Sequence, residues 1–428
     1  MDQTCLPVLA VSVLLGVKSV LRTRCRWPVH FRKSHTAVTS VIGLSTMIYD
    51  VIIIGGGPSG LSTALHIARL MPELIPSTLV LEKSHYPRMK LCAGGLVADA
   101  EVILQRLGLD VGEIPHVDAA AAHLDFAGEG LTVALPKTHA LRIIRRDEFD
   151  SWLAKKTREA GIDVREGVTV RRVVRGAEDA TVETEAGTFT ARIVVGADGS
   201  NGITRRSVLP DTPVHTARVL EIITPAIPDP PEHKADHAYF DFFPVPDGIA
   251  GYTWDFPTQI KGQSSRCWGI YDTNLLADHR RPPLKDPLAQ EMRRHGYNLE
   301  DYEIQGHPIR WFSPFNRFSV PHVILVGDAA GADGIFGEGI SIALGYGRLA
   351  ARAIRQACST GDFSFRDYHR RILMSPLGQA LTVRTAITQS LYRMHWAWFQ
   401  KFFWRVLKPV VAGAAMVFVL NWARRMGE

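Results

Sequence analysis

The chain has 428 residues, of which 46% are hydrophobic and 21% charged, so it is long enough for two or three globular domains. Its five cysteines are widely spaced and include no C-x-x-C pair, which argues against a disulfide scaffold, a zinc site and an iron–sulfur cluster. Of the net charge of +6, residues 1–46 and 390–428 each contribute +5 (six Lys/Arg, one acid), which leaves about −4 for the body and excludes a basic nucleic-acid surface there.

The N-terminal segment has an apolar run, "CLPVLAVSVLLGV" at residues 5–17, that is too short to span a bilayer. Positive charges follow this run instead of preceding it, which is atypical of a secretory signal. Met47 stands directly before "IYDVIIIGGG", where a nucleotide-binding strand would begin. We therefore expect residues 1–46 to be a disordered leader, a stretch that is not translated because the true start is Met47, or a short membrane-associating segment.

Residues 49–82 carry a dinucleotide-binding fingerprint. The β-branched run Val51–Ile54 predicts a buried parallel strand, and a helix is predicted from about Ser59 to Leu70. Between them lies the G-x-G-x-x-G of Gly55, Gly57 and Gly60, whose glycines permit a tight turn, close approach of a pyrophosphate and close helix packing. A second strand ends at Glu82, whose carboxylate can accept hydrogen bonds from ribose hydroxyls.

Two distant segments identify the dinucleotide. An apolar strand at Ile193–Val195 precedes Asp198 and Gly199, and another at Val323–Val326 precedes Gly327 and Asp328. A further helix, predicted from Gly339 and Ile340, can direct its first amides at a flavin pyrimidine, and Asp328 can accept from a ribityl hydroxyl. A cofactor that contacts both ends of one domain is predicted to be an extended FAD.

Several motifs resemble known flavoproteins. "RRDEFDSWL" contains R-x-x-F-D-x-x-L, and "GADGS" and "GDAAG…GEGI" are shared by the p-hydroxybenzoate-hydroxylase-like superfamily. "KLCAGGL" is similar to the Cys-x-Gly-Gly segment of the geranylgeranyl reductase family, and "GYTWDFP" matches its Y-x-W-x-F-P motif. Residues 48–385 therefore resemble geranylgeranyl reductases, with Ala93 standing where many relatives have glycine.

The resemblance implies an α/β fold: a Rossmann-type FAD-binding domain (47–125, 140–210 and 310–365), an inserted antiparallel-sheet substrate domain (126–139 and 211–309) and C-terminal helices (366–428). Together with the fingerprint, it implies the FAD-binding residues Gly55, Gly57, Pro58, Ser59, Gly60, Glu82, Lys83, Cys92, Ala93, Gly94, Arg146, Val170, Asp198, Gly199, Gly327, Asp328, Gly337, Gly339 and Ile340.

The aromatic motif has strand periodicity. Tyr252, Trp254 and Phe256 alternate and would share one face of a strand, followed by Pro257. Aromatic strands at "DHAYFDFFP" and "SSRCWGIYD" would complete an antiparallel sheet over the flavin. By resemblance these four residues line a substrate tunnel; the alternative is that the rings fill a core.

Cys92 has no neighbouring ligands for a metal and no adjacent base except His85 to activate it as a nucleophile. By resemblance it lies beside the isoalloxazine ring and is the candidate catalytic residue, tuning access or protonation; the alternative is a packing cysteine. The sequence identifies no proton donor.

The C-terminal region, from about Asp367, is predicted to be helical. It is rich in tryptophan and phenylalanine, and Pro409–Ala423 carries no charge before Arg424 and Arg425. This pattern favours a helix lying in a membrane interface over one packed on the FAD-binding domain. We accordingly expect a cytoplasmic protein peripherally associated with membranes.

The resemblance implies an FAD-dependent oxidoreductase that reduces isoprenoid C=C bonds on a diphosphate, a lipid or a quinone. The electron donor would be NADPH or a reduced carrier such as ferredoxin. The partners expected are an isoprenoid lipid substrate and a membrane surface, with no nucleic acid and no metal. A flavin monooxygenase, an electron-transfer flavoprotein that reduces quinone, and a non-redox cyclase are the alternatives.

Overall fold

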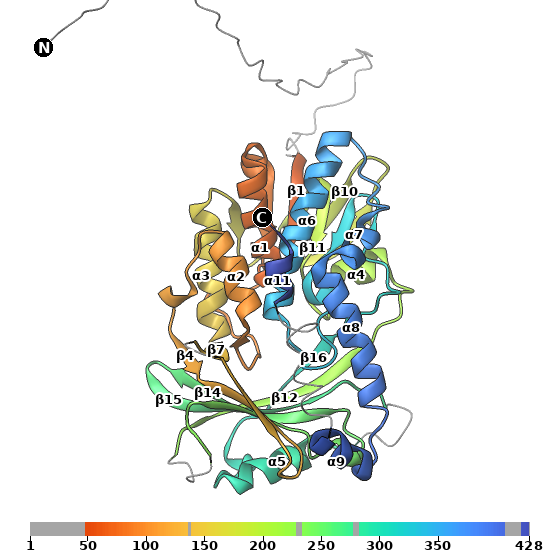
Figure 1. The fold of residues 1–428 in the computed structure, drawn as a ribbon. Coiled ribbons are helices and arrows are strands. Elements are labelled where there is room, and N and C mark those ends of the chain that lie inside the picture. The colour runs from red at the N-terminus through yellow and green to blue at the C-terminus, as the bar shows by residue number, and fades with distance from the viewer. Residues whose placement is uncertain (1–47, 136–137, 228–232, 277–281, 407–420, 428) are drawn as a thin grey trace, which may run out of the picture. The chain divides into compact units, whose positions relative to one another are not determined.

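The computed structural model describes residues 48–135, 138–227, 233–276, 282–406 and 421–427, which all belong to one compact unit, Thr46–Glu428 (Figure 1). Residues 1–46 lie outside the described residues, so the expectations for them remain predictions. Three sheets organise the described chain: an eight-stranded sheet, a seven-stranded sheet and a three-stranded sheet. This is the α/β architecture with a separate antiparallel sheet that the sequence predicted.

The eight-stranded sheet contains the predicted nucleotide-binding strands. Its path is β17-β18-β11-β1-β2-β8, with β10 pairing with β11 and β9 with β10. β1 pairs in parallel with β2 and β11 because its residues Val51, Ile52 and Ile53 are apolar, β-branched and fully buried on both faces. The bounds are β1 Ile48–Ile54, β2 Thr78–Leu81, β8 Asp163–Arg165, β9 Val170–Arg175, β10 Ala180–Thr184, β11 Gly187–Gly196, β17 Ser319–Val320 and β18 Val323–Leu325.

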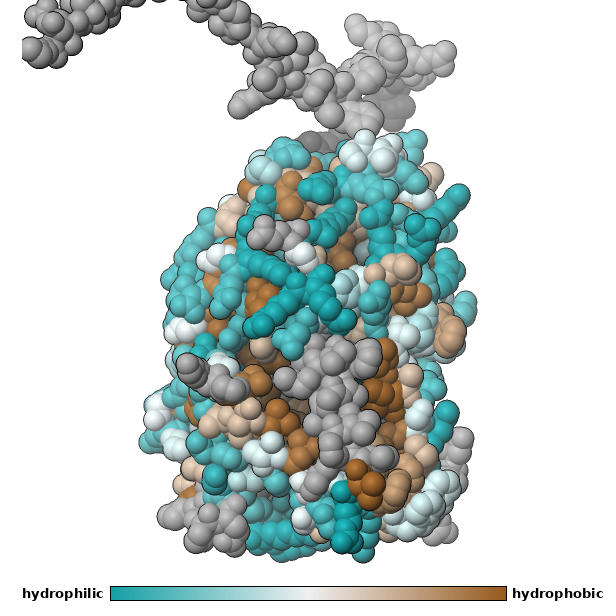
Figure 2. Space-filling view, in the orientation of Figure 1, coloured by the Kyte–Doolittle hydropathy of each residue, from teal (hydrophilic) through white to brown (hydrophobic). Residues whose placement is uncertain are grey.

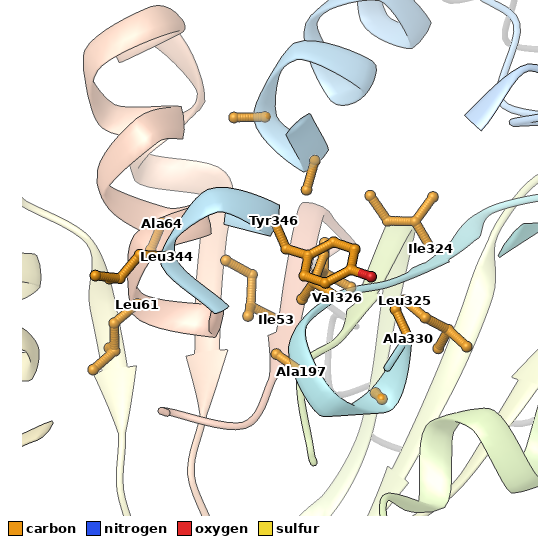
Figure 3. Close-up of a cluster of buried hydrophobic side chains, with 14 of the residues drawn as sticks. Ile53, Leu61, Ala64, Ala197, Ile324, Leu325, Val326, Ala330, Leu344 and Tyr346 are labelled. Carbon is orange, nitrogen blue, oxygen red and sulfur yellow. The ribbon is translucent and has the colours of Figure 1, made fainter. Parts of the chain in front are cut away.

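Helices α1 and α6 pack tightly against each other beside this sheet. A Cβ added at Gly347 of α6 would lie 2.4 Å from Ser62 Oγ of α1, and the Ser62 hydroxyl donates to Leu344 O at 2.7 Å. Figure 3 shows Leu61 and Ala64 of α1 near Leu344, with Tyr346 beside the strands. The helices here are α1 Pro58–Leu70, α2 Ala98–Arg106, α3 Arg146–Glu159, α4 Ile203–Val208, α6 Ile340–Thr360, α7 Tyr368–Met374 and α8 Pro376–Leu391.

The seven-stranded sheet runs in the order β16-β12-β15-β14-β13-β5-β6 and is antiparallel except between β13 and β5. Helix α5 (Lys285–Arg294) covers its outer face through a cluster that includes Trp268, Leu288 and Met292. Its strands are β5 Ala121–Asp125, β6 Leu131–Ala134, β12 Thr216–Pro225, β13 His237–Asp241, β14 Gly251–Ile260, β15 Gln263–Asp272 and β16 Gln305–Arg310.

The predicted boundary between the domains was wrong at one point. Residues 121–125 form β5 of the seven-stranded sheet, not part of the FAD-binding domain, because β5 pairs with both β6 and β13. The smaller sheet, in the order β3-β7-β4, is formed by Gly95–Leu96, Leu141–Ile144 and His116–Ala119. Short 3-10 turns lie at Pro72–Ser77, Val111–Glu113, Val245–Asp247, Leu299–Asp301 and Gly327–Ala329.

The end of the chain is anchored in the main core. α9 spans Ala397–Val406 and α11 spans Trp422–Arg425; the Trp422 side chain is fully buried, and a Cβ added at Gly345 of α6 would lie 2.5 Å from its ring. The Asp99 carboxylate accepts from the backbone N–H groups of Asn421 at 3.0 Å and Ala423 at 2.8 Å. The predicted interfacial helix is therefore wrong at its end, where burial and amide pairing hold the chain on the FAD-binding domain.

Residues 409–420 of that predicted helix lie outside the described residues. Among the helices that the structure describes, none is long and apolar enough to cross a membrane.

Candidate active site

A cavity of about 1850 Å³ extends from the turn after β1 to the inner face of the seven-stranded sheet. Its walls include the glycine-rich turn, the segment Lys83–Ser84 and Arg88–Gly95, the start of α6, and side chains of β12, β14 and β16. Residues that are more than 200 positions apart therefore line one open-sided cavity, which has a nucleotide-binding end and an aromatic end.

The turn after β1 is an open backbone cradle. Gly55 has a φ of +106°, and Gly57 is the N-cap of α1. A Cβ added at Gly57 would meet nothing nearer than Arg88 Nη2 at 3.7 Å, whereas one at Gly60 would lie 2.0 Å from Gly55 O. Gly57 thus leaves room for a ligand at the helix N-terminus, and Gly60 is required for packing, as the fingerprint predicted.

Glu82 is held by the backbone at the end of β2. Its Oε2 accepts from Gly56 N at 2.9 Å and its Oε1 accepts from Ser84 N at 3.0 Å. Arg88 lies 3.6 Å away through Nε and donates through Nη2 to Asp150 at 3.0 Å. Each carboxylate oxygen of Glu82 keeps further acceptor capacity, so the oriented group can still accept ribose hydroxyls.

The R-x-x-F-D-x-x-L motif forms an ion pair on the first turns of α3. Arg146 donates through Nε and Nη2 to the two oxygens of Asp150, both at 2.8 Å. Asp150 is fully buried and also forms an ion pair with Arg88, so two guanidinium groups contact its carboxylate. This network fixes Arg146 at the cavity wall beside Cys92.

The second predicted contact surface lies across the cavity. Asp328, after β18, accepts from Ser200 Oγ at 3.3 Å, and its Oδ1 lies 3.7 Å from a Cβ added at Gly339. Asp198 instead caps α4, because its Oδ2 accepts from Thr204 N at 2.8 Å and from Thr204 Oγ1 at 2.9 Å. Its burial raises the pKa of this carboxyl above the ordinary value.

The inner face of the seven-stranded sheet is mainly aromatic. Tyr252, Trp254 and Phe256 of β14 line the cavity together with Phe240 of β13 and Phe336. Phe240 packs edge-on against Phe256 with ring centroids 5.0 Å apart, and the Tyr252 hydroxyl donates to Phe336 O. These rings therefore form one rigid apolar wall.

Gly269 of β15 has no side chain, and this leaves room for the Trp254 ring on the wall. Gly269 pairs with Trp254 in the sheet, and a Cβ added at Gly269 would lie 2.0 Å from the indole. Gly269 also pairs with Glu221 of β12. The indole thus lies flat over β15, next to the strand that carries Glu221.

Cys92 lies where the nucleotide-binding end meets the aromatic wall. Its Sγ accepts from Gly94 N at 3.4 Å, and its backbone N–H donates to Glu221 Oε1 at 3.3 Å. Burial raises the pKa of the thiol, with the Arg146 guanidinium opposing this shift in part. A neutral thiol at neutral pH argues against a thiolate nucleophile.

Three further ionisable groups line the cavity on the same side. Lys90 Nζ donates to His307 Nε2 of β16, and Glu221 lies on the adjacent strand β12. Burial lowers the pKa of Lys90 to about 8 and, with the Lys90 charge, that of His307 to about 4. Burial raises the pKa of Glu221 to about 7. We call Lys90, Glu221 and His307, with Cys92 and Arg146, the polar corner.

The sequence profile of the FAD binding domain family matches residues 48–332. The chain belongs to this family. It is 27% identical over 335 residues to a digeranylgeranylglycerophospholipid reductase of Methanothermobacter thermautotrophicus, covering 74% of this chain and 80% of the relative. It is 23% identical over 370 residues to the protein FixC of Escherichia coli, covering 78% of this chain and 83% of FixC.

A solved structure with the same fold is that of a geranylgeranyl bacteriochlorophyll reductase-like protein from Thermoplasma acidophilum. It has a TM-score of 0.69 and 21% identity, and the match covers 88% of this chain and 98% of that protein. The resemblance inferred from the motifs is thus confirmed, as is the predicted α/β fold with its FAD-binding domain. The chain is an FAD-dependent oxidoreductase-type flavoprotein.

The cavity fits FAD at its nucleotide-binding end. Gly57 is open, and a Cβ added at Gly199 meets no atom within 4 Å, so backbone can approach a ligand at both places. Glu82 and Asp328 would hold the ribose and ribityl hydroxyls, and the first amides of α1 would hold the pyrophosphate. When bound, FAD supplies two-electron hydride chemistry.

The structure brings most of the predicted site residues together, including Pro58, Ser59, Lys83, Ala93, Gly94, Val170, Gly337 and Ile340 as cavity lining. Three predicted residues do not line it. Gly60 and Gly327 serve helix packing, since a Cβ at Gly327 would lie 2.5 Å from Ser59 Oγ, and Pro257 alternates away from Phe256.

Several lining residues were not predicted: Arg88, Lys90, Glu221, Phe240, His307 and Phe336. Phe240 could have been found from the alternation of "HAYFDFF", and Lys90 begins the segment "KLCAGGL", whereas Arg88, Glu221 and His307 belong to no motif quoted above.

Proposed function

We propose that this flavoprotein reduces C=C bonds of an isoprenoid chain carried on a diphosphate, a lipid or a quinone. One observation carries the proposal: the FAD cradle and the aromatic inner wall of the seven-stranded sheet belong to one cavity. A prenyl chain offers no hydrogen-bonding groups, so it is suited to a wall of rings and aliphatic side chains. Electrons would come from NADPH or from a reduced carrier such as ferredoxin.

The apolar character of the wall extends across four strands. Besides the rings of β13 and β14, the lining includes Leu124 of β5 and Leu131 and Val133 of β6. The ionisable side chains of this face, Glu221 and His307, lie on β12 and β16 at the opposite edge of the sheet. This arrangement supports an elongated apolar substrate whose reacting bond lies near the polar corner. The named activity of the Methanothermobacter relative supports the same substrate class.

The test compares acceptors in anaerobic half-reactions. Protein with dithionite-reduced FAD is mixed with geranylgeranyl diphosphate, with a short-chain quinone, or with neither, and the return of oxidised flavin absorbance is followed. The proposal predicts reoxidation by the prenyl compound. Reoxidation by the quinone alone would instead support electron transfer, and hydroxylated product that forms only after oxygen is admitted to the mixture would support a monooxygenase.

Replacing Cys92 with alanine tests whether the thiol contributes to turnover. The backbone N–H that donates to Glu221 is kept in this variant, and the thiol beside Arg146 is lost. We expect FAD content to be unchanged and turnover to fall roughly tenfold, or ~1.4 kcal/mol in barrier height. Full turnover, or loss of FAD, would show that Cys92 is a packing residue.

Replacing Gly269 with alanine tests the aromatic wall. The added methyl overlaps the Trp254 ring at 2.0 Å, so the indole must move into the cavity. We expect normal FAD binding and a loss of prenyl reduction on the order of 10- to 100-fold, since misplacement of about 1 Å costs that much. Gly306→Ala on β16 is the matched control, because its Cβ would make only ordinary contacts, 3.4 Å from Leu220 Cδ2. Equal activity of both variants would contradict the assignment of the wall.

We further propose that α9 meets a membrane surface from which the substrate enters. Trp398 is 69% exposed, Trp396 and Phe402 are about half exposed, and Lys401 and Arg405 are exposed beside them. Figure 2 shows apolar surface in the region where Figure 1 places α8 and α9. Exposed rings with basic neighbours suit an anionic lipid interface.

Sedimentation with anionic lipid vesicles tests this surface. The wild-type protein is expected to co-sediment, and Trp398→Ala and Lys401→Glu are expected to reduce binding without changing FAD content. Binding that is equal for wild type and both variants would place the contact elsewhere.

A further inference from the structure

We propose that Glu221 is the proton donor of the reduction, placed by β12 at the junction of the cofactor end and the aromatic end of the cavity. The inference rests on the proposed function and adds a residue for the proton that alkene reduction requires. Among the residues that the structure describes, Glu221 is the one carboxyl group of the seven-stranded sheet that lines the cavity.

The burial of Glu221 is unusual for a glutamate. Its side chain is only 5% exposed, and its neighbours on the same face of β12 are the buried Val219 and the half-buried Ile223. Oε1 accepts from Cys92 N, but Oε2 makes no hydrogen bond. A buried carboxylate with a free oxygen is costly, whereas a protonated carboxyl has a lower desolvation cost and presents an O–H. The geometry therefore favours an acid group at Oε2.

The surroundings of Glu221 keep the proton available at neutral pH. Burial raises its pKa to about 7, opposed by the Cys92 N–H and by nearby cations. The charged groups that act on Glu221 itself are Arg145, Arg146 and Lys90, and Glu221 in turn acts on the thiols of Cys92 and Cys267. Asp328 acts on the neighbouring Lys90 and His307. A pKa close to the working pH is the optimum for a general acid, because both proton loss and proton recovery are then accessible.

Neighbouring residues would orient the reacting bond toward this acid. Gly269, which pairs with Glu221, has no side chain, and the Trp254 ring lies over it. A flat alkene stacked on that ring would therefore lie next to Glu221. The Cys92 N–H donates a hydrogen bond to Glu221, and this contact holds the loop on the cofactor side of the cavity next to the acid.

The π bond of the alkene breaks and two C–H bonds form. One carbon would take a hydride equivalent, which reduced FAD held in the cavity would supply as the two-electron reductant, and the other would take the proton from Glu221 Oε2, whose O–H bond breaks. Water returns a proton to the carboxylate after the product leaves, and the electron donor restores the reduced cofactor.

The first test needs neither cofactor nor substrate. Infrared spectra of the FAD-free protein are recorded between pH 5 and 9 for wild type, Glu221→Gln and the matched control Glu300→Gln, which replaces an exposed glutamate. We expect the difference spectrum of wild type minus Glu221→Gln to contain a protonated carboxyl band at pH 6 that is lost as the pH rises through about 7. The subtraction removes the bands of other carboxyls with a raised pKa, such as Asp99 and Asp241, and the control should keep the Glu221 band. If the Glu221 band is missing already at pH 5, Glu221 is ionised at that pH, and the inference is overturned.

The second test uses the FAD-loaded protein with geranylgeranyl diphosphate. Glu221→Gln is expected to keep FAD and its reduction by dithionite, to lose about 10²–10⁴-fold in prenyl reduction, and to lose the fall in rate seen above neutral pH. Undiminished reduction by this variant would overturn the inference alone. If wild type itself reduces no prenyl bond, the proposed function fails, and the inference fails with it.

Discussion

Replacing Gly55 with alanine is expected to abolish FAD binding and to destabilise the protein by about 2–5 kcal/mol. Gly55 has a φ of +106°, which costs a residue with a side chain about 1–2 kcal/mol. The new Cβ would also lie 2.4 Å from Ala197 O, a backbone atom that cannot move freely, and such overlap costs about 1–3 kcal/mol. The turn would open, and the amides of α1 would lose their orientation toward the pyrophosphate.

Gly187→Ala is the matched control for this substitution. Gly187 is the first residue of β11 and has a φ of +124°, and a Cβ there meets no atom within 4 Å. It should show only the backbone strain, with FAD bound normally. Urea unfolding measures the free energy of unfolding, and fluorescence titration with FAD measures the affinity for the cofactor. Equal stability and equal FAD affinity of the two variants would show that the close approach of Gly55 to Ala197 has no role.

Replacing Trp422 with alanine is expected to cost about 3–5 kcal/mol in free energy of unfolding. The ring is fully buried in the main core, where it lies against Gly345 of α6. Its backbone neighbours Asn421 and Ala423 donate to Asp99 of α2, so loss of the ring also loosens the attachment of the chain end. Thermal and urea unfolding measure the effect.

Trp398→Ala provides the comparison, because that side chain is 69% exposed on α9. The two substitutions remove the same atoms, so the difference between them measures burial. Trp398→Ala should leave the free energy of unfolding within about 0.5 kcal/mol of wild type, as surface substitutions usually do. A destabilisation as large as that of Trp422→Ala would mean that α9 is covered in the isolated protein.

The sequence alone predicted the elements that have local patterns. The run Val51–Ile54 with its glycines specified β1, the turn and α1, and the alternation of Tyr252, Trp254 and Phe256 specified which side of β14 carries rings. The motifs of these segments belong to single elements, so their structure follows from residues that are near in sequence.

The polar corner could not be predicted in this way. Lys90, Glu221 and His307 come from a loop and two strands, and only the register Val219↔His307 and the hydrogen bond from Cys92 bring them together. Trp422 was misread for a similar reason: an aromatic residue before two arginines has the same local pattern whether it lies in a membrane interface or in the core. The burial of the ring against Gly345 and the amide contacts with Asp99 distinguish the two, and both depend on residues far away in the sequence.

The most direct test of the proposed function is mass spectrometry of the product. The protein, detergent-solubilised and loaded with FAD, is incubated anaerobically with dithionite and a geranylgeranylated lipid or diphosphate. We predict product ions heavier by the mass of H₂ for each reduced C=C bond. Unchanged mass, with the flavin remaining reduced until quinone or oxygen is admitted, would contradict isoprenoid reduction and assign the aromatic wall to another ligand.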